Sequence, residues 1–424
     1  MTFEVVCLTI FSNSLFFIFF LYQMLVEFRV KNFRSFKEEQ VLSLVATKDN
    51  SLENNKISTS RKDIPSLLRC AVIYGANASG KSNLLKAMAC MRSIFGVVTS
   101  PEPQRSNILD AFKPFLLDLK SHDSPITFEI TFILNDVRYQ YSFSWAKERI
   151  VSEYLLAYKT ARPQKWFERR FNEETNEDEY TFSSFLNGDK QSWKKQTRND
   201  ALFLWIGTQY NSQQLIPIFN WIFQKFNIAL SDSLVDIRTH FTHMSYFQYT
   251  LKRCKEDQVF RRKILNFMIS CDTGITDICI NPNDQLFFVH GMHSFPVSEE
   301  SAGTVQLFSF AGIIQEVLDK GHIFIIDELD CHLHPLLVRK LVKRFHDPEE
   351  NRNNAQMIFV THDVSLLKAD LFRRDQIWFV EKDPQTQEST LYPLSDFKHK
   401  DDDMRYIDNN YLLGCYGAIP CLRD

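Results

Sequence analysis

The hydrophobic pattern of this chain alternates between short apolar runs and longer amphipathic stretches. Three runs, residues 72–74, 323–326 and 357–360, are rich in β-branched and aromatic side chains, which is typical of strands buried on both faces. Residues 127–132 and 139–143 instead alternate apolar and polar positions, and this period of two predicts antiparallel strands. The pattern therefore predicts an α/β chain with a central sheet and a separate antiparallel part.

The spacing of these runs predicts the domain organisation. We expect residues 24–149 to form an N-terminal lobe and residues 286–424 to form a C-terminal lobe. Between them, residues 150–285 contain amphipathic stretches at 214–226 and 257–269, so we predict a helical lid or insertion there. No heptad repeat persists for three periods in this interval, which argues against a long coiled coil.

The first residues of the chain need a separate interpretation. Residues 5–22 are largely apolar and uncharged, but the run barely reaches the length of a membrane span and polar residues interrupt it. No basic residue precedes it, so it lacks the first part of a signal peptide. We interpret Met24 as the true start and residues 1–23 as an upstream extension, with a membrane anchor as the disfavoured alternative.

A glycine-rich loop follows the first buried run. Residues 75–82 read Gly-Ala-Asn-Ala-Ser-Gly-Lys-Ser, a complete phosphate-binding loop of the form GxxxxGK[ST]. Its glycines let backbone N–H groups turn toward phosphate oxygens, and the helix that begins there presents its positive end to the same place. The chain is therefore predicted to bind ATP. The expected nucleotide-binding residues here are Gly75, Asn77, Ser79, Gly80, Lys81, Ser82 and Asn83.

Polar residues also end the other two buried runs. Asp327 and Glu328 follow the second run; we expect Asp327 to hold Mg²⁺ together with the Ser82 hydroxyl, and Glu328 to orient the attacking water. His362 follows the third run, at the edge where an open α/β sheet collects its ligand groups. We therefore predict that Glu328 and His362 are the catalytic residues.

A second anion-binding cap is predicted at residues 301–304. This segment reads Ser-Ala-Gly-Thr and precedes a helical stretch that leads to the Asp327 run. A serine and a glycine at a helix N-terminus can bind an anion through the free backbone N–H groups. Ser301 and Gly303 are therefore added to the expected nucleotide-binding residues.

The order of these motifs resembles that of ABC-type P-loop ATPases. Residues 24–36, which include Asn-Phe-Arg-Ser, look like the first strand and turn of the RecF-, SMC- and OLD-like ATPases. Further segments resemble one subfamily, the AAA-type ATPases related to OLD nucleases that occur in phage-defence operons, including those of the PARIS type. Those segments are 298–304, 327–330, 333–335, 374–382, 391–397 and 416–420.

The resemblance implies more than the residues do alone. It implies an α/β ABC-type P-loop ATPase fold with a mixed central sheet, an antiparallel β lobe and a helical insertion. It nominates Arg34 as a contact to the nucleotide phosphates. In such ATPases the Ser301 segment caps the γ-phosphate bound by another subunit, which implies a homo-oligomer built from head-to-tail ATP dimers. Ala302 stands where Asp or Gly is commoner in this signature.

Three functions compete under this resemblance. The favoured one is the ATPase subunit of an antiviral complex, which holds a separate Toprim-type nuclease from the same operon until a phage trigger protein releases it. The second is a RecF- or SMC-like ATPase that clamps DNA in repair. A transporter ATPase is disfavoured, because one apolar segment cannot form a transport path. A nuclease in this chain is also disfavoured, because the segment after His362 is too short for a Toprim domain.

Composition refines this choice. The 424 residues carry a net charge of −3, so the chain lacks the overall basic charge of a nucleic-acid-binding protein. Basic runs at 162–170, 194–198 and 252–263 keep local contact with DNA as an alternative. The nine cysteines show no CxxC spacing, which favours a reducing cytoplasm without disulfides or a zinc site.

Overall fold

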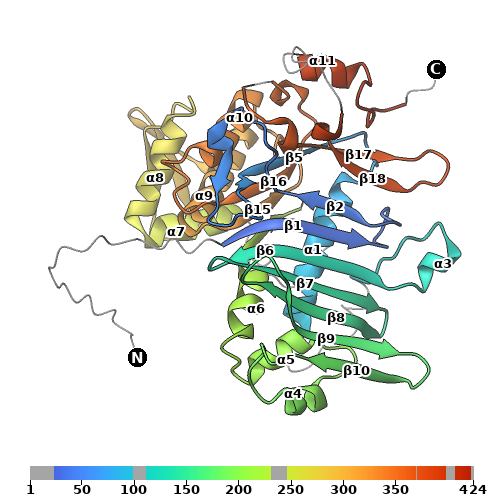
Figure 1. The fold of residues 1–424 in the computed structure, drawn as a ribbon. Coiled ribbons are helices and arrows are strands. Elements are labelled where there is room, and N and C mark those ends of the chain that lie inside the picture. Colours follow the sequence, from blue (N-terminus) through green and yellow to red (C-terminus); the bar gives the residue numbers. More distant parts are fainter. Residues whose placement is uncertain (1–22, 99–110, 231–245, 369, 398–405, 422–424) are drawn as a thin grey trace.

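The structure is a computed structural model that describes residues 23–98, 111–230, 246–368, 370–397 and 406–421 (Figure 1). The expected upstream extension falls on residues 1–23, of which residues 1–22 lie outside the described residues. Two large sheets dominate the described part of the chain.

The core sheet has six strands in the order β11-β15-β16-β5-β17-β18. All neighbours are parallel except β17 and β18, which are antiparallel. Every residue of β5, β15 and β16 is buried, as the three apolar runs predict. The strands are β5 (Cys70–Tyr74), β11 (Phe226–Ala229), β15 (Ile323–Ile326), β16 (Gln356–Val360), β17 (Ile377–Lys382) and β18 (Ser389–Pro393).

The second sheet has seven strands in the order β10-β9-β8-β7-β6-β1-β2, all antiparallel. The predicted pair at 127–132 and 139–143 is confirmed, because these residues lie in β6 and β7 and hydrogen-bond to each other. The strands are β1 (Gln23–Lys31), β2 (Gln40–Ser43), β6 (Ile126–Leu134), β7 (Val137–Ala146), β8 (Arg149–Tyr158), β9 (Gln164–Asn172) and β10 (Glu177–Phe182). Small sheets are formed by β3 (Lys56–Ser58) with β4 (Ser66–Leu68), and by β12 (Asp277–Ile280), β13 (Leu286–His290) and β14 (His293–Pro296).

Helices cover both faces of the core sheet, so alternate residues of its strands enter two different cores. Ile73 and Ile325 belong to the core shared with α1, α6 and the antiparallel sheet. Val72 and Phe324 belong to the core formed with α8, α9 and α10. Each such buried aliphatic side chain stabilises the fold by about 1.5–3 kcal/mol. In the described part of the chain, no helix combines the length and the apolar character needed to cross a membrane.

The helices are arranged in two groups (Figure 1). Helices α4 to α6 lie beside the antiparallel sheet, and α7 to α10 lie beside the core sheet. The main helices are α1 (Lys81–Val98), α3 (Leu119–His122), α4 (Lys190–Gln196), α5 (Phe203–Gln209), α6 (Leu215–Gln224), α7 (Tyr246–Glu256), α8 (Gln258–Ile269), α9 (Ala302–Lys320), α10 (Pro335–His346) and α11 (Ile407–Leu412).

Residues 150–285, expected to form a helical insertion, contain strands as well as helices. Strands β8, β9 and β10 extend the antiparallel sheet, and β11 is an edge strand of the core sheet. The reason is visible in β8, where buried residues such as Leu155 and Ala157 alternate with more exposed ones, a period that suits a strand. Arg169, in the basic run at 162–170, is fully buried and bonds to Asp178 at 2.7 Å. That arginine is therefore not part of a surface for DNA.

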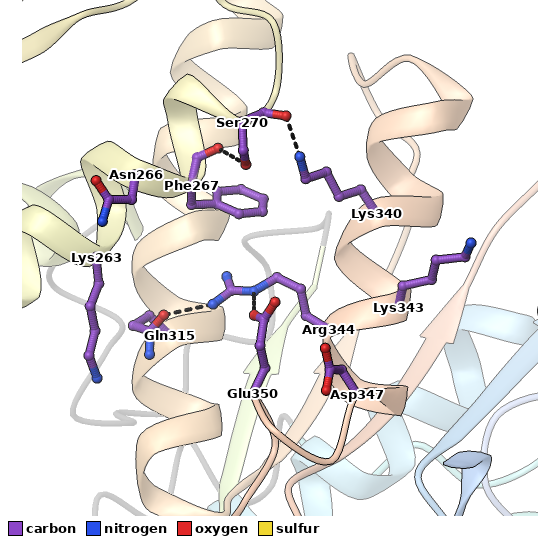
Figure 2. Close-up of a pocket in the computed structure, with 10 residues that line it drawn as sticks. All are labelled: Lys263, Asn266, Phe267, Ser270, Gln315, Lys340, Lys343, Arg344, Asp347 and Glu350. Carbon is purple, nitrogen blue, oxygen red and sulfur yellow. Dashed lines mark hydrogen bonds and ion pairs between the residues drawn. The ribbon is translucent and has the colours of Figure 1, made fainter. Parts of the chain in front are cut away.

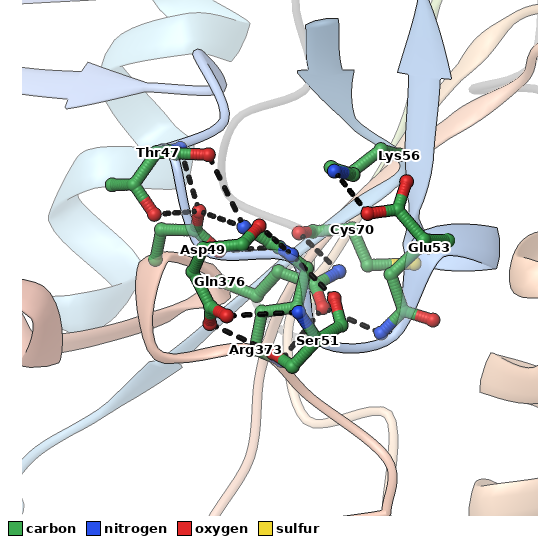
Figure 3. A network of polar contacts seen from close by, with 10 residues as sticks. Thr47, Asp49, Ser51, Glu53, Lys56, Cys70, Arg373 and Gln376 are labelled. Carbon is green, nitrogen blue, oxygen red and sulfur yellow. Dashed lines mark hydrogen bonds and ion pairs between the residues drawn. The ribbon is translucent and has the colours of Figure 1, made fainter.

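A buried polar network fixes the amino-terminal end of β5 (Figure 3). Arg373 is fully buried and donates to both carboxylate oxygens of Asp375 at 3.0 and 2.8 Å. It also donates to the Asp49 carbonyl at 2.9 Å. Gln376 donates to the carbonyl of Cys70, the first residue of β5, at 3.0 Å. A buried charge is tolerated only when it is paired and hydrogen-bonded in this way, so these bonds hold the loop after β2 against the core sheet.

A second buried contact joins the two large sheets. Strand β2 pairs with β1 only from Glu27 to Val30, so it does not cover the backbone of Leu25. Gln356, the first residue of β16, accepts a hydrogen bond from the Leu25 N–H at 2.7 Å and donates to the Leu25 carbonyl at 3.1 Å. The same amide donates to the Leu68 carbonyl at 3.0 Å. One side chain therefore satisfies three buried backbone groups at the junction.

Replacing this side chain tests the junction. Gln356→Met should lower the free energy of unfolding by about 2–4 kcal/mol, because it leaves buried N–H and C=O groups unpaired. Urea denaturation followed by circular dichroism measures the change. The matched control is Gln385→Met at an exposed position, where we expect a change within about 0.5 kcal/mol. Equal effects of the two substitutions would contradict a special role for Gln356.

Candidate nucleotide-binding site

The predicted motifs meet at one edge of the core sheet. Strands β5, β16 and β15 are parallel neighbours, and their registers pair Ile73 with Val360 and Ile326 with Phe359. The segments that leave these strands therefore emerge at the same edge. They are the glycine-rich loop after β5, Asp327 after β15 and residues 361–363 after β16.

The two glycines of the loop occupy positions that no side chain fits. Gly75 has φ 155°, and a Cβ there would lie 2.3 Å from the Val380 carbonyl oxygen. Gly80 has φ 113°, and a Cβ there would lie 2.5 Å from the Ser389 Oγ. Contacts this short are not seen for real Cβ atoms. Both glycines are thus required by the fold of the loop.

Polar bonds from both sheets hold the loop. The Ser389 hydroxyl, at the start of β18, donates to the Ser79 carbonyl at 2.5 Å. The Ser389 N–H donates to the carbonyl of Ser35, in the turn between β1 and β2, at 2.8 Å. The predicted contact residue Asn83 donates to the Ser35 Oγ at 2.8 Å. Asn83 therefore links α1 to the turn, and Asn77 is exposed at the tip of the loop.

Lys81 is held inside the loop. Its side chain is 5 % exposed, and its ammonium donates to the carbonyls of Gly75 and Ala76, both at 2.9 Å. Burial lowers the pKa of Lys81 to about 8, and the charges of Asp327, Glu328 and nearby Asp330 act in the opposite direction. The carboxylates are thus close enough to Lys81 to affect its pKa. The ammonium lies inside the loop that would bind the phosphates.

The carboxylates and His362 form one charged cluster. Asp327 is buried. Glu328 is exposed and its backbone has φ 54°, so its side chain points to solvent while that of Asp327 does not. His362 is exposed, and its backbone N–H donates to the Asp330 carboxylate at 3.3 Å. Partial desolvation and the charge of Lys81 lower the pKa of His362, against the pull of the three carboxylates. A neutral imidazole at neutral pH follows from this direction.

The Ser301 segment begins α9 as predicted. The Ser301 hydroxyl accepts from the Thr304 N–H at 3.1 Å and so caps the helix. Gly303 packs against the loop after β15, because a Cβ there would lie 2.8 Å from the His332 carbonyl oxygen. The segment therefore contacts the loop that follows Asp327.

Arg34 lies in the turn beside the loop, with φ 53°. Its N–H donates to the Lys113 carbonyl at 2.8 Å, and its guanidinium carbon lies 5.7 Å from the centre of the Phe33 ring. The Nε atom is buried and has no hydrogen-bond partner among the described residues. Arg34 also lowers the pKa of Cys90 in α1, although burial raises it more. These contacts place Arg34 along α1, and its contact to phosphate stays a prediction.

The residues fit a nucleotide with Mg²⁺. Ser79 is buried, and its Oγ has no hydrogen-bond partner among the described residues. Ser82 is half-buried in the first turn of α1. Together with the carboxylate of Asp327 it offers the hard oxygen donors that Mg²⁺ prefers.

Three residues of this site were missing from the expected list. Asp330 was quoted only as part of the segment 327–330, yet its carboxylate accepts a hydrogen bond from the His362 N–H, and its Oδ1 is buried without a hydrogen-bond partner among the described residues. Ser35 was part of the quoted turn, so its proximity to Arg34 was a usable signal. Ser389 follows a polar turn and carries no sequence signal for a contact with the loop.

Comparison with a protein-family model decides the family. Residues 70–205 and 282–368, more than half of the chain, match the model described as "AAA domain, putative AbiEii toxin, Type IV TA system". The chain belongs to this AAA family. The matched ranges of the AAA domain contain the glycine-rich loop, the Ser301 segment, both carboxylates and His362. Family membership therefore places the AAA chain among the P-loop ATPases.

Other comparisons of the AAA chain are distant. No curated protein sequence matches it. It is 14 % identical, with a TM-score of 0.45, to an SMC head bound to the C-winged helix domain of ScpA, over 87 % of this chain and 97 % of that one. It is 13 % identical, with a TM-score of 0.41, to the SMC head domain from Thermotoga maritima, over 87 % and 98 %. For an SMC head from Pyrococcus yayanosii the identity is 12 % and the TM-score 0.45, over 92 % and 100 %.

The pKa of Lys81 predicts how ATP affinity depends on pH. Bound phosphates would raise this pKa. The affinity for ATP should therefore be greatest below the pKa of the free protein, about 8, and should fall as the pH rises above it. The dissociation constant should then rise about tenfold per pH unit. Fluorescence titration with a labelled ATP analogue measures it. Lys81→Arg keeps the charge at all these pH values, so a steep pH dependence that survives in this variant would contradict the assignment.

Proposed function

We propose that this chain hydrolyses ATP to ADP and phosphate at the edge of the core sheet. The observation that carries the proposal is the cluster of Lys81, Asp327, Glu328 and the neutral imidazole of His362 beside the glycine-rich loop. Lys81 binds the β- and γ-phosphates, and the exposed Glu328 accepts a proton from the attacking water and orients it. Ser82 and Asp327 would hold Mg²⁺, which would neutralise phosphate charge.

The proposed active form is a head-to-tail dimer. Helix α9 has 19 residues and β15 has four, lengths of about 28 Å and about 13 Å. Since α9 runs back along the sheet toward β15, its Ser301 end extends beyond the strand that carries Asp327. A capped N-terminus that projects in this way suits a γ-phosphate held by a second copy of the chain. ATP would then lie between two protomers, contacted by the loop of one and by Ser301 and Gly303 of its partner.

We further propose that hydrolysis acts as a switch in antiviral defence, in the cytoplasm, as in PARIS-type ATPases. The family description names an AbiEii toxin and a type IV toxin–antitoxin system, which supports a defence role. In this proposal the ATP-bound oligomer holds a separate Toprim-type nuclease, and a phage protein triggers its release. A ligand that binds one protomer arrangement better than another can drive such a change.

Glu328→Gln tests the hydrolytic role. The variant should bind ATP normally, because Glu328 is exposed and outside the glycine-rich loop, but hydrolyse it about 10²–10⁴-fold more slowly. Phosphate release measures the rate, and light scattering after gel filtration should show ATP-dependent dimers that persist. Glu174→Gln, at an exposed position of the β9–β10 hairpin, is the matched control. Full turnover by Glu328→Gln would remove Glu328 from the mechanism.

Affinity purification tests the defence role. The tagged protein, expressed with its native gene neighbourhood, should retain a nuclease-like neighbour in fixed stoichiometry when ATP is present. Mass spectrometry identifies the retained protein, and Lys81→Ala should retain none because it cannot bind nucleotide. If a lone ATP dimer retained DNA instead, the alternative RecF- or SMC-like repair function would replace this proposal.

A further inference from the structure

A second site lies away from the glycine-rich loop. A pocket of about 430 Å³ opens between α8, α9 and α10 (Figure 2). Its lining includes none of the residues assigned to the nucleotide site. Four of its lining side chains are cationic and two are carboxylates, so the pocket carries a net positive charge.

Arg344 is the buried cation of this pocket. It is 7 % exposed, and Figure 2 shows it reaching from α10 toward Gln315 of α9. It donates to the Glu350 carboxylate at 2.5 Å and to the Gln315 side-chain oxygen at 2.7 Å, and it lies 4.7 Å from the centre of the Phe267 ring. Its third nitrogen, Nη1, is buried without a hydrogen-bond partner among the described residues. An unpaired donor on a buried guanidinium is costly, and an anion in the pocket would relieve that cost.

Lys343 is a second cation among the lining residues, and Figure 2 shows its side chain extending away from Arg344. It is exposed, and no hydrogen bond or ion pair of its side chain occurs in the described part of the chain. The other two lysines are already engaged, since Lys263 bonds to Asp319 at 2.8 Å and Lys340 bonds to the Ser270 carbonyl. Among the cationic side chains of the pocket, Arg344 Nη1 and the Lys343 ammonium are therefore the donors left for a ligand.

Two exposed aliphatic residues lie near the pocket without lining it. The bond between Lys340 and Ser270 brings the first half of α10 to the end of α8. At that end, Leu336 lies one turn before Lys340 and is 68 % exposed, and Ile269 precedes Ser270 and is 49 % exposed. A basic pocket with two exposed aliphatic residues nearby offers both charge and apolar contact area.

We propose that this pocket binds an acidic peptide segment of a partner protein. A Glu or Asp carboxylate of the peptide accepts a charge-assisted hydrogen bond from Arg344 Nη1, and a second acidic residue of the peptide pairs with the exposed Lys343. A neighbouring apolar side chain of the peptide packs against Leu336 and Ile269. The carboxylates of Asp347 and Glu350 line the same pocket, so a nucleic acid, with a charge on every phosphate, would meet more repulsion than a peptide whose acidic residues alternate with apolar ones.

Fluorescence anisotropy tests this site with a labelled peptide of alternating Glu and Leu residues and the complete protein. The matched peptide with Gln in place of Glu should bind about tenfold or more weakly. Lys343→Glu should weaken binding of the acidic peptide about fivefold or more, and Arg344→Lys should weaken it by removing the Nη1 donor. Lys252→Glu makes the same charge change at an exposed position of α7 and should leave binding unchanged.

The outcomes separate this site from the nucleotide site. ATP hydrolysis by Lys343→Glu should equal that of the unmodified protein, so loss of peptide binding with full hydrolysis supports the proposal even if the ATPase assignment fails. Equal binding of the Glu and Gln peptides would overturn it, as would unchanged binding by Lys343→Glu. Displacement of the peptide by inorganic phosphate or a thymidine oligonucleotide at lower concentration would assign the pocket to phosphate instead.

Discussion

Gly80 lies between the side chains of Ser35 and Ser389, which come from two different sheets. A Cβ on Gly80 would stand 2.5 Å from the Ser389 Oγ and 2.7 Å from the Ser35 Oγ. The glycine-rich loop can therefore close only if the β1–β2 turn and the start of β18 approach it together. Every other group of the site depends on this closure, because the loop determines where α1 begins and where the ammonium of Lys81 lies.

The strands that could be predicted from the sequence are those in which the period of apolar residues matches the burial in the structure. The apolar runs of β5, β15 and β16 and the alternating strands β6 and β7 were found because burial leaves a direct periodic pattern. Strand β8 was not predicted, because its buried residues include the carboxylate of Glu153 and the interval also contains true helices. The contact of Ser389 with the loop could not be predicted, because it joins segments about three hundred positions apart through one side chain.

Charge balance explains why the site can accept a triphosphate. Lys81, which is buried, and three carboxylates oppose one another across the edge of the sheet. A polyanion alone would be repelled by those carboxylates, so a divalent cation bound with it would supply the compensation that the side chains lack. The Ser301 cap adds donors without adding a full charge. In the proposed site, backbone and hydroxyl groups would donate to the phosphates, and the bound cation would neutralise much of their charge.

Gln356 also affects how a movement of the glycine-rich loop would reach the antiparallel sheet. It holds β1 at Leu25 with bonds of 2.7 and 3.1 Å, while the turn after β1 is held at Ser35 by Ser389 and Asn83. A strand fixed near both ends transmits a shift at one end to the other, because sliding it would break buried hydrogen bonds. Movement of the loop on phosphate binding would therefore reach β6, which pairs along β1. The side-chain amide of Gln356 is therefore the fixed point about which β1 and the seven-stranded sheet would move.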